Sequence, residues 1–389
     1  MRFEASFEVA DSPNFEMSDL QFEVCETLGG IEKSEWDACF PGELERYDYL
    51  LAVEKSSLRG FQWRYATIRS YGRLIAAAPV FLCDYGLETT LERGRLSRLI
   101  EKLRSIVPGF LSLKLACLGS PCTECGRIGT HPGIPDLWKA DLLAVMLRQT
   151  SAWAERAGYG LFGLKDIPLP LDWTLSKAID EAGLVRMASL PTASLSIDFS
   201  SIDTYLSRLS PGTRKDMRRK LRARSQVTVE TVEDLGDLLP RFIELYRQTR
   251  LRSEWQFEDL TEDYFAGVLA NMGSNAFCKV YRVGDEVLAF NLLLRDEARL
   301  VDKFFCMDAE RGRSYNLYYM SWFENIRFCL ENRLALYQSG QAYYENKIRL
   351  GSQLTENALF FRHKNPVLQS VLGLLAPLFG TDGTGKARQ

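Results

Sequence analysis

Apolar and polar residues form two similar patterns, one in each half of the chain. In the first half, residues 63–69 and 74–82 have the composition of two strands joined by a tight turn. Residues 277–283 and 287–294 repeat this arrangement in the second half. The second strand of each pair is almost wholly apolar, which is expected when both of its faces are covered.

Each pattern continues into a helix and a further strand. In the first half, the helix is predicted at 137–157 and the strand at 159–164. In the second half, a third strand at 299–307 precedes a helix at 316–332 and a short strand at 334–338. The helix at 316–332 is apolar around most of its circumference, so we expect it to be buried. Both halves therefore predict an antiparallel meander, a helix and another strand.

The length of 389 residues is enough for two domains. A new strand begins after a proline near residue 191 and marks the predicted boundary. We expect an N-terminal tail at 1–20, domains at 21–190 and 191–365, and an apolar segment with a polar tail at 366–389. The predicted fold class is α/β (α+β), with a mixed, mostly antiparallel sheet flanked by helices in each domain.

The composition is that of a globular protein, with 46% hydrophobic and 25% charged residues. The N-terminus is acidic and lacks the layout of a secretory signal, and no window offers the ~20 continuous apolar residues of a spanning helix. We therefore expect a cytoplasmic protein without a transmembrane segment. The apolar segment at 366–380 and an amphipathic pattern at 95–111 favour peripheral contact with the inner face of the membrane.

Cysteine and histidine limit the chemistry that the chain can perform. Cys122 and Cys125 have the spacing of half a zinc site, but no second pair follows, so we expect a turn and no metal. The nine cysteines are odd in number and sit mostly in apolar contexts, which is typical of a reducing compartment. With only His131 and His363 in the chain, a general base must be a carboxylate, a water held by one, or a perturbed Lys or Tyr.

A helix N-terminus offers unpaired backbone N–H groups and the positive end of a dipole, which suit a diphosphate. The loop between the strand at 299–307 and the helix at 316–332 resembles the acyl-CoA pyrophosphate loop of GNAT enzymes: a Gln or Arg, two residues, Gly, any residue, then Gly or Ala. The resemblance is partial, because the second small position has no clear match, and an ordinary strand-to-helix turn is the alternative. It implies a cofactor-binding set of Phe305, Met307, Arg311, Gly312, Arg313, Ser314 and Asn316.

Residues 340–351, GQAYYENKIRLG, resemble the Gly-rich strand end of the Fem-type and cellulose-biosynthesis-associated branch of the GNAT superfamily. A basic helix at 209–225 is a second element of that branch. The resemblance covers about residues 22–364 and implies two tandem GNAT-like domains. The donor would bind in the C-terminal domain, and the N-terminal domain would shape the acceptor pocket.

Basic residues are concentrated in one stretch of the chain. Seven basic residues and one acid between Arg214 and Arg224 give a local charge of +6, within a chain whose total is −3. On a helix, Arg214, Arg218 and Arg222 share a face, and Lys215 and Arg219 lie beside them. This face suits a CoA phosphate, an anionic lipid headgroup or a transfer RNA acceptor stem; a solvated helix without a ligand is the alternative.

An amine that attacks a thioester must lose a proton, so the site needs a base near the point where the strands splay. Glu345 is the first candidate, because a carboxylate at the end of an apolar strand has a raised pKa. Asp302, inside an apolar run, is the second, and Lys347 and Tyr344 complete the catalytic set. The alternatives are a buried salt bridge of Asp302 with Lys303 or Lys347, and a packing role for Tyr344. Asp302 and Lys303 should point to opposite faces of their strand.

These features lead to three hypotheses about function. The first is N-acyl transfer from an acyl thioester, preferably acyl-CoA, to a primary amine, with a long-chain or lipid amine favoured by a resemblance to bacterial ceramide synthases. The second is a Fem-like aminoacyl transferase that uses charged transfer RNA on the helix at 214–224. The third is a binding protein that keeps the GNAT fold without catalysis.

Overall fold

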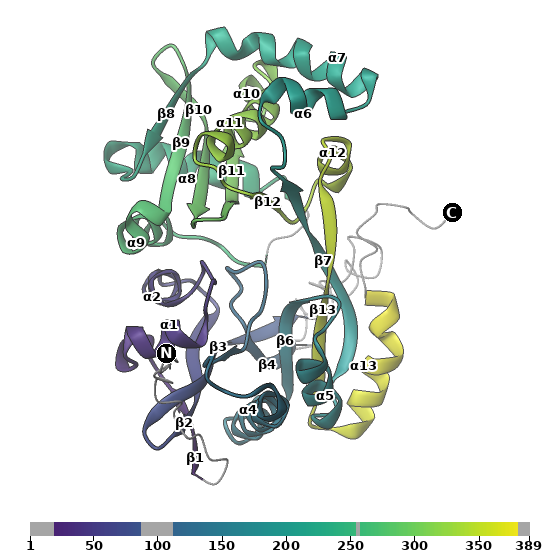
Figure 1. The fold of residues 1–389 in the computed structure, drawn as a ribbon. Helices are drawn as coiled ribbons and strands as arrows, with labels where there is room; N and C mark the ends of the chain where they lie inside the picture. Colours follow the sequence, from purple (N-terminus) through teal and green to yellow (C-terminus); the bar gives the residue numbers. More distant parts are fainter. Residues whose placement is uncertain (1–18, 87–111, 254–256, 380–389) are drawn as a thin grey trace, which may run out of the picture.

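The computed structural model describes residues 19–86, 112–253 and 257–379. Most of the tail predicted at 1–20 and the amphipathic segment predicted at 95–111 lie outside the described residues. Within the described part, the thirteen strands belong to one sheet, which runs through both halves of the molecule. Helices cover both faces of the sheet in each half (Figure 1).

The N-terminal half holds one end of the sheet. Its strands are β1 (Leu20–Cys25), β2 (Phe61–Ser70), β3 (Arg73–Gly86), β4 (Ser112–Leu118), β5 (Gly129–Thr130) and β6 (Leu161–Pro168). Its helices are η1 (Leu28–Gly30), α1 (Lys33–Cys39), α2 (Tyr47–Lys55), α4 (Asp136–Arg156) and α5 (Trp173–Glu181).

The C-terminal half holds the other end. Its strands are β8 (Thr228–Val232), β9 (Ala276–Val283), β10 (Glu286–Arg295), β11 (Arg299–Met307) and β12 (Leu336–Gly340). Its helices are α6 (Ile202–Arg208), α7 (Pro211–Lys220), η3 (Leu221–Gln226), η4 (Gly236–Leu238), α8 (Leu239–Arg250), α9 (Glu262–Met272), η5 (Gly273–Asn275), α10 (Arg311–Ser314), α11 (Leu317–Glu331) and α12 (Tyr344–Arg349).

The two halves repeat one arrangement, as the sequence pattern predicts. In the first, β2, β3 and β4 form an antiparallel meander, α4 follows, and β6 pairs in parallel with β4. In the second, β9, β10 and β11 form the meander, α11 follows, and β12 pairs in parallel with β11. The predicted mixed sheet, mostly antiparallel and flanked by helices, is confirmed.

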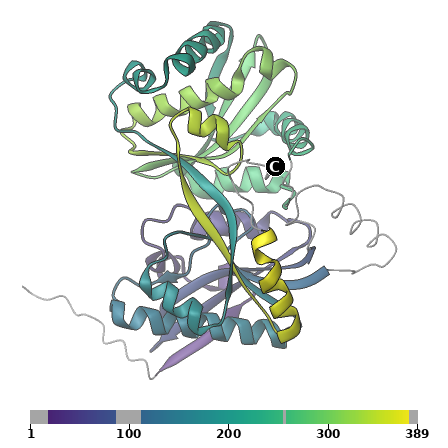
Figure 2. The same ribbon diagram turned by 90° about the vertical axis from the view of Figure 1, so that its right-hand side faces the viewer.

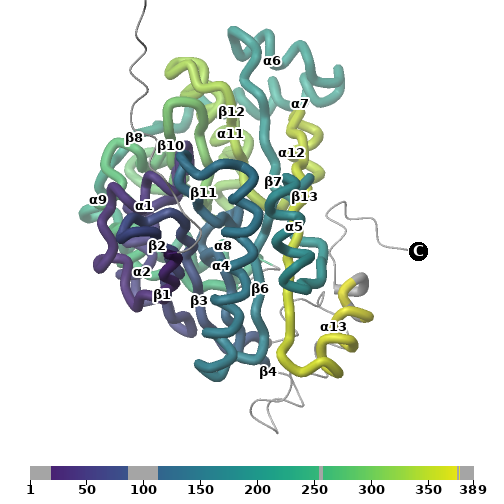
Figure 3. Tube along the Cα trace, turned by 60° about the horizontal axis from the view of Figure 1, so that its bottom comes forward, coloured from purple at the N-terminus to yellow at the C-terminus, as the bar shows by residue number. Residues whose placement is uncertain are grey.

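Two long strands join the halves. β7 (Val185–Ser196) pairs with β12 at one end and with β13 (Gln353–His363) along most of its length. β13 in turn pairs with β6, so the chain returns to the N-terminal half after completing the C-terminal one. Figures 2 and 3 show this strand pair crossing between the halves. The boundary predicted near residue 190 therefore falls inside β7, and β13 extends the N-terminal part of the sheet.

A hydrophobic core also crosses the junction. Trp36 and Tyr49 from the N-terminal half belong to the same buried cluster as Phe242 and Phe290 from the C-terminal half. The Tyr49 hydroxyl lies 2.9 Å from the Tyr264 hydroxyl, where α2 packs against α9. Since the halves share a sheet and a core, side chains at their junction are held in place from both sides.

The apolar segment predicted at the C-terminus forms helix α13 (Pro366–Phe379), which packs on β7 and β13. Leu372 on this helix faces the protein, whereas Leu374 is 80% exposed. None of the helices in the described part of the chain combines the length and apolarity needed to cross a bilayer.

Candidate active site

The sheet opens between β11 and β12. Their parallel pairing covers only Arg299–Val301 and Leu336–Gln338. Beyond it, β11 stays with β10 as far as Met307, while β12 follows β7. The pairing of β11 with β10 skips Lys303, which is the extra residue of a β-bulge. A bulge bends its strand and re-aims the side chains beside it, so the sequence at 302–304 helps to form the opening.

Asp302 faces α11 from one side of β11. Its carboxylate accepts hydrogen bonds from Asn291 Nδ2 at 2.6 Å, Tyr337 Oη at 3.0 Å and Asn325 Nδ2 at 3.3 Å. Burial raises the pKa of Asp302, although the hydrogen bonds from Asn291 and Tyr337 oppose this shift. Asp302 is thus a carboxyl group that is held rigidly and takes up a proton more readily than an exposed aspartate.

Lys303 points the other way, toward the N-terminal half. Its side chain is only 3% exposed, and Nζ donates to Glu45 Oε1 at 2.5 Å and to the Cys122 carbonyl at 2.9 Å. Burial disfavours its charge, but the carboxylates of Glu45 and Glu124 outweigh burial and raise the pKa of Lys303. The prediction that Asp302 and Lys303 face opposite sides is confirmed, and the alternative of a salt bridge between them is wrong.

Glu124 is a residue of this site that the sequence did not reveal. It lies in the turn between Cys122 and Cys125, and its carboxylate accepts from Gln338 Nε2 at 2.5 Å. A Cβ on Gly340 would lie 2.9 Å from Glu124 Oε1, and Gly340 has a φ of +80°, so only glycine fits there. Burial raises the pKa of Glu124. The N-terminal half thus supplies a carboxylate to the end of β12.

Lys347 lies on α12 and is buried against the same strand end. Its Nζ donates to the carbonyls of Ser339 at 2.5 Å and Gly340 at 2.9 Å. Burial lowers the pKa of Lys347 to about 8, against the opposing charges of Glu124 and Asp302. A neutral amine has two N–H bonds and one lone pair. Both N–H bonds would be used by these carbonyls, which leaves the lone pair to accept a proton.

The prediction that Glu345 lies at the end of an apolar strand is wrong. The strand ends at Gly340, because Ala342 and Tyr343 have φ values of 90° and 53°. Glu345 therefore lies in the first turn of α12 and is exposed. The buried strand end on which its predicted role depended is absent. The Tyr344 hydroxyl donates to the Pro191 carbonyl at 2.8 Å, and burial raises its pKa.

The loop predicted to bind a diphosphate is largely occupied by its own contacts. Asp308 Oδ1 accepts from the amides of Glu310 at 3.2 Å and Arg311 at 2.9 Å, and the Asp308 carbonyl accepts from the Gly312 amide at 3.0 Å. Arg311 forms an ion pair with Glu286. A Cβ on Gly312 would lie 3.0 Å from Met307 Sδ, so Met307 packs under the loop. Residues 311–314 form the short helix α10, and Arg313 and Ser314 are exposed.

Free amides occur at the end of this loop, where α11 begins. Asn316 adopts a left-handed φ of 55° before α11 and gives no side-chain cap. The first amide there with a carbonyl acceptor is that of Met320, which bonds to Asn316. Among the residues that the structure describes, the amides of Leu317, Tyr318 and Tyr319 have no acceptor. The Tyr318 hydroxyl is also unpartnered there, and its ring packs on Phe305 at 6.0 Å.

The basic helix lies beside this N-terminus. Lys220 Nζ lies 3.5 Å from the ring centroid of Tyr319. The helix α7 ends at Lys220 and continues as the 3-10 turn η3, so Arg222 does not share a regular helix face with Arg214 and Arg218 as predicted. Arg219 pairs with Asp216 at 2.8 Å, while Arg218 is exposed.

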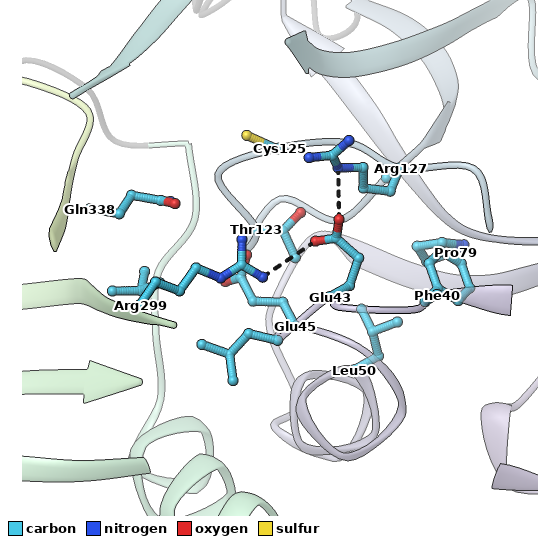
Figure 4. Close-up of a pocket in the computed structure, with 13 residues that line it drawn as sticks. Phe40, Glu43, Glu45, Leu50, Pro79, Thr123, Cys125, Arg127, Arg299 and Gln338 are labelled. Atoms are coloured by element: carbon cyan, nitrogen blue, oxygen red, sulfur yellow. Dashed lines mark ion pairs between the residues drawn. The ribbon is translucent and has the colours of Figure 1, made fainter. Parts of the chain in front are cut away.

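Two pockets lie at the junction of the halves. The larger is a cavity of about 450 Å³, bounded by Glu124, Lys303 and residues of β4, β6, β7 and β13. The smaller holds about 80 Å³. Figure 4 shows Glu43 in the smaller pocket between the guanidinium groups of Arg127 and Arg299, at 3.2 and 3.8 Å. Since Arg299 begins β11, its ion pair with Glu43 links the two halves.

The site contains no group that suits a metal ion: within residues 19–86, 112–253 and 257–379, no three His, Cys, Asp or Glu side chains gather closely enough to hold one. Cys122 and Cys125 are free thiols, and burial raises the pKa of both.

Comparison with known proteins identifies this architecture. Residues 211–347 match the family model described as an acetyltransferase (GNAT) domain. The chain is similar in fold to FemX, with 13% identity and a TM-score of 0.59 over 88% of this chain and 98% of that one. It is also similar to a tandem GNAT protein from the clavulanic acid biosynthesis pathway, with 12% identity and a TM-score of 0.51 over 90% and 99%.

No curated protein sequence matches the chain. Residues 211–347 thus form a GNAT domain, and the fold of the chain is similar to that of FemX and of a tandem GNAT protein. The GNAT domain is that of a transferase, and its match ends at Lys347, so it includes β11, α11, β12 and the first part of α12.

Proposed function

We propose that the chain is an N-acyltransferase that moves an acyl group from acyl-CoA to a primary amine. The observation that carries the proposal is the N-terminus of α11, where the amides of Leu317, Tyr318 and Tyr319 have no acceptor within the described residues. Three successive free amides at a helix N-terminus suit a diphosphate. The diphosphate of acyl-CoA would bind there, and the same molecule supplies the acyl thioester.

The residues beside α11 fit this ligand. Lys220 lies over Tyr319 and adds positive charge next to the free amides. Phe305, at the end of β11, packs on Tyr318 and so extends the site from the helix toward the opening of the sheet. A ligand that enters the opening meets Asp302 on β11 and the end of β12, where Lys347 is held.

We assign the general base to Lys347. The ammonium group of the acceptor first gives one proton to the lone pair of Nζ and becomes the nucleophilic amine. As the C–N bond then forms and the C–S bond breaks, the second proton goes to the departing thiolate, which leaves as the CoA thiol. A pKa of about 8 suits this role, because a base works best when its pKa lies near the operating pH. Asp302 remains the second candidate base, since burial raises its pKa as well. Tyr344 and Glu345 stay predictions, the latter now as an exposed group.

The donor is tested by calorimetry with CoA and with CoA esters of several chain lengths. Binding of the diphosphate group at α11 predicts heat with CoA itself and with each ester. Complete absence of heat with all of them would refute the assignment of the donor.

The base is tested by Lys347→Met, with Lys279→Met as the matched control. Lys279 is a second buried lysine, its pKa is also lowered to about 8 by burial, and its Nζ donates to the Glu324 carbonyl at 2.6 Å. We expect Lys347→Met to lower kcat by about 10²- to 10⁴-fold, the usual contribution of a general base, and Lys279→Met to leave it within about 3-fold. Equal losses in the two variants would exclude Lys347 as the base.

Transfer from charged transfer RNA is the second candidate. The exposed Lys215, Arg218 and Arg222 lie on or just after α7, whose Lys220 contacts Tyr319 of α11. A polyanion along this surface would reach the same site. Its binding should weaken steeply with salt, roughly in proportion to the number of phosphates contacted. Measured binding of charged transfer RNA between 50 and 200 mM salt, set against CoA binding in the same buffers, separates the two donors.

The third candidate function is that of a binding protein without catalysis. It predicts that Lys347→Met and wild type behave alike with every donor and amine.

We propose a cytoplasmic location with peripheral contact at the inner face of the membrane. The basis is a set of apolar residues exposed on α13: Val367, Val371 and Leu374. Sedimentation with anionic vesicles, compared between wild type and Leu374→Asp, tests that contact.

A further inference from the structure

The cavity at the junction of the halves has an apolar end built from aromatic and aliphatic side chains. The Phe257 ring lies 6.1 Å from the rings of both Phe81 and Tyr85, and Leu115 and Leu372 complete the wall. Leu372 comes from α13, so the helix forms part of the wall at this end of the cavity. The volume of about 450 Å³ is within the range of about 300–1,000 Å³ that ligand pockets occupy.

The other end of the cavity is lined by charged groups: Glu124, Lys165, Asp166, Glu258 and Lys303. Both lysines already have a carboxylate partner. Lys303 pairs with Glu45 at 2.5 Å, and Lys165 pairs with Asp166 and donates to the Thr123 carbonyl at 2.7 Å.

Two carboxylates at this end form no ion pair within the described residues. Glu124 accepts a hydrogen bond from the neutral side chain of Gln338. The positive charges that act on it, those of Lys303 and Lys347, belong to lysines bonded to other groups. Positive charge also reaches Glu258 from nearby lysines, chiefly from Lys165, which is paired with Asp166. A carboxylate that is removed from water without a partner is costly, and a cation beside it offsets that cost. An ammonium group satisfies this end of the cavity, whereas a second carboxylate would meet repulsion.

The charged end adjoins the proposed reaction centre. The Glu124 carboxylate lies against Gly340, and the Gly340 carbonyl accepts from Lys347 Nζ at 2.9 Å. An amine beside Glu124 is thus placed near the base, and a tail attached to it extends toward Phe257 and Leu372.

We propose that this cavity binds the acceptor, and that the acceptor is a primary amine carrying an apolar chain. The proposal rests on the N-acyltransferase function and names its acceptor class. Glu124 and Glu258 receive the ammonium group, and the wall of Phe81, Tyr85 and Leu372 receives the chain. Glu124 and Glu258 are positioning residues, because Lys347 takes the proton.

The test measures binding to the full-length chain without any donor, so it does not depend on transfer. Decylamine, butylamine and decanoate are titrated by calorimetry at pH 7. Each buried methylene contributes about 4-fold in affinity, so with its six additional methylenes decylamine should bind on the order of 10³-fold more tightly than butylamine. Decanoate should not bind measurably. Equal affinity for decylamine and decanoate, or for decylamine and butylamine, would overturn the proposal.

Matched variants locate the ligand. Leu372→Trp fills the cavity and should weaken decylamine binding at least 10-fold, whereas Leu374→Trp changes a residue on the same helix that is 80% exposed and should not. Glu258→Gln should also weaken decylamine binding at least 10-fold. Its neighbour Asp259, which is 63% exposed in its side chain and pairs with Arg250, provides the control Asp259→Asn. Equal effects of a variant and its control would place the ligand elsewhere.

The outcome also separates this proposal from the function on which it rests. If CoA esters bind and acylate a small polar amine while decylamine does not bind, only the acceptor assignment fails. If decylamine binds as described and no CoA ester binds, the cavity assignment stands and the acyl-CoA donor fails. A lipid amine in vesicles, used in place of free decylamine, shows whether the chain takes its acceptor from a membrane or from solution.

Discussion

The buried amine of Lys347 should give the protein a specific dependence of stability on pH. Its pKa is about 8 in the folded chain, against an ordinary value of 10.5. The unfolded chain therefore binds more protons than the folded chain between pH 8 and pH 10.5, and the free energy of unfolding rises with pH in this window. Replacing Lys347 with Met removes the titrating group and should remove this rise.

The size of the effect follows from the difference of 2.5 between the two pKa values. At pH 7 the charged lysine costs the folded state about 3 kcal/mol, because each unit corresponds to about 1.4 kcal/mol. By pH 9 the amine is mostly neutral in the folded chain, and the cost has fallen to about 2 kcal/mol. Wild type should therefore gain about 1 kcal/mol relative to Lys347→Met between pH 7 and pH 9.

The assay is urea unfolding of wild type and Lys347→Met at pH 7, 8 and 9, followed by tryptophan fluorescence. Lys279 titrates in the same window, but it is present in both proteins, so its contribution cancels in the comparison. If the two proteins show parallel dependence on pH across this range, Lys347 is not a lysine with a lowered pKa. The assignment of the general base would then lose its physical support.

Three further outcomes test other parts of the site. Gly340→Ala should destabilise the chain by about 1–2 kcal/mol through the positive φ of this position alone, which urea unfolding measures. It should also abolish acyl transfer, because the new Cβ meets Glu124, and single-turnover kinetics measure that loss. Asp302→Asn should lower kcat less than 10-fold if Lys347 is the base, and the pH profile of kcat should keep its limb near 8. Arg218→Glu should leave transfer from acyl-CoA within about 3-fold, whereas a loss of more than 10-fold with charged transfer RNA as donor would favour the second candidate function.

Local pattern was sufficient to predict much of the fold. The helix expected at 137–157 is α4, and the helix expected at 316–332 is α11. The strands expected at 277–283 and 299–307 are β9 and β11. Such elements are readable because the period of apolar residues depends on neighbours a few positions away. The opposite orientation of Asp302 and Lys303 was predictable for the same reason.

Elements that depend on backbone exceptions were predicted less well. Residues 340–351 have the composition of a strand end, but the positive φ values at Ala342 and Tyr343 turn the chain into α12. The diphosphate site was expected in the loop at residues 311–317 that enters the helix; Asp308 satisfies amides at the start of this loop, and the amides without an acceptor in the described residues begin at Leu317, at its end.

The sequence by itself determined the repeated pattern of strands and helices, the GNAT-like character of the second half and the two strand residues at the opening of the sheet. Only the tertiary structure decided that Glu124 meets Gln338 from 214 positions away, that β13 returns to the N-terminal half, and that Lys347 is buried. The physical reason is that a pKa and a cavity depend on which distant segments exclude water from a group. Periodicity along the chain carries no information about those segments.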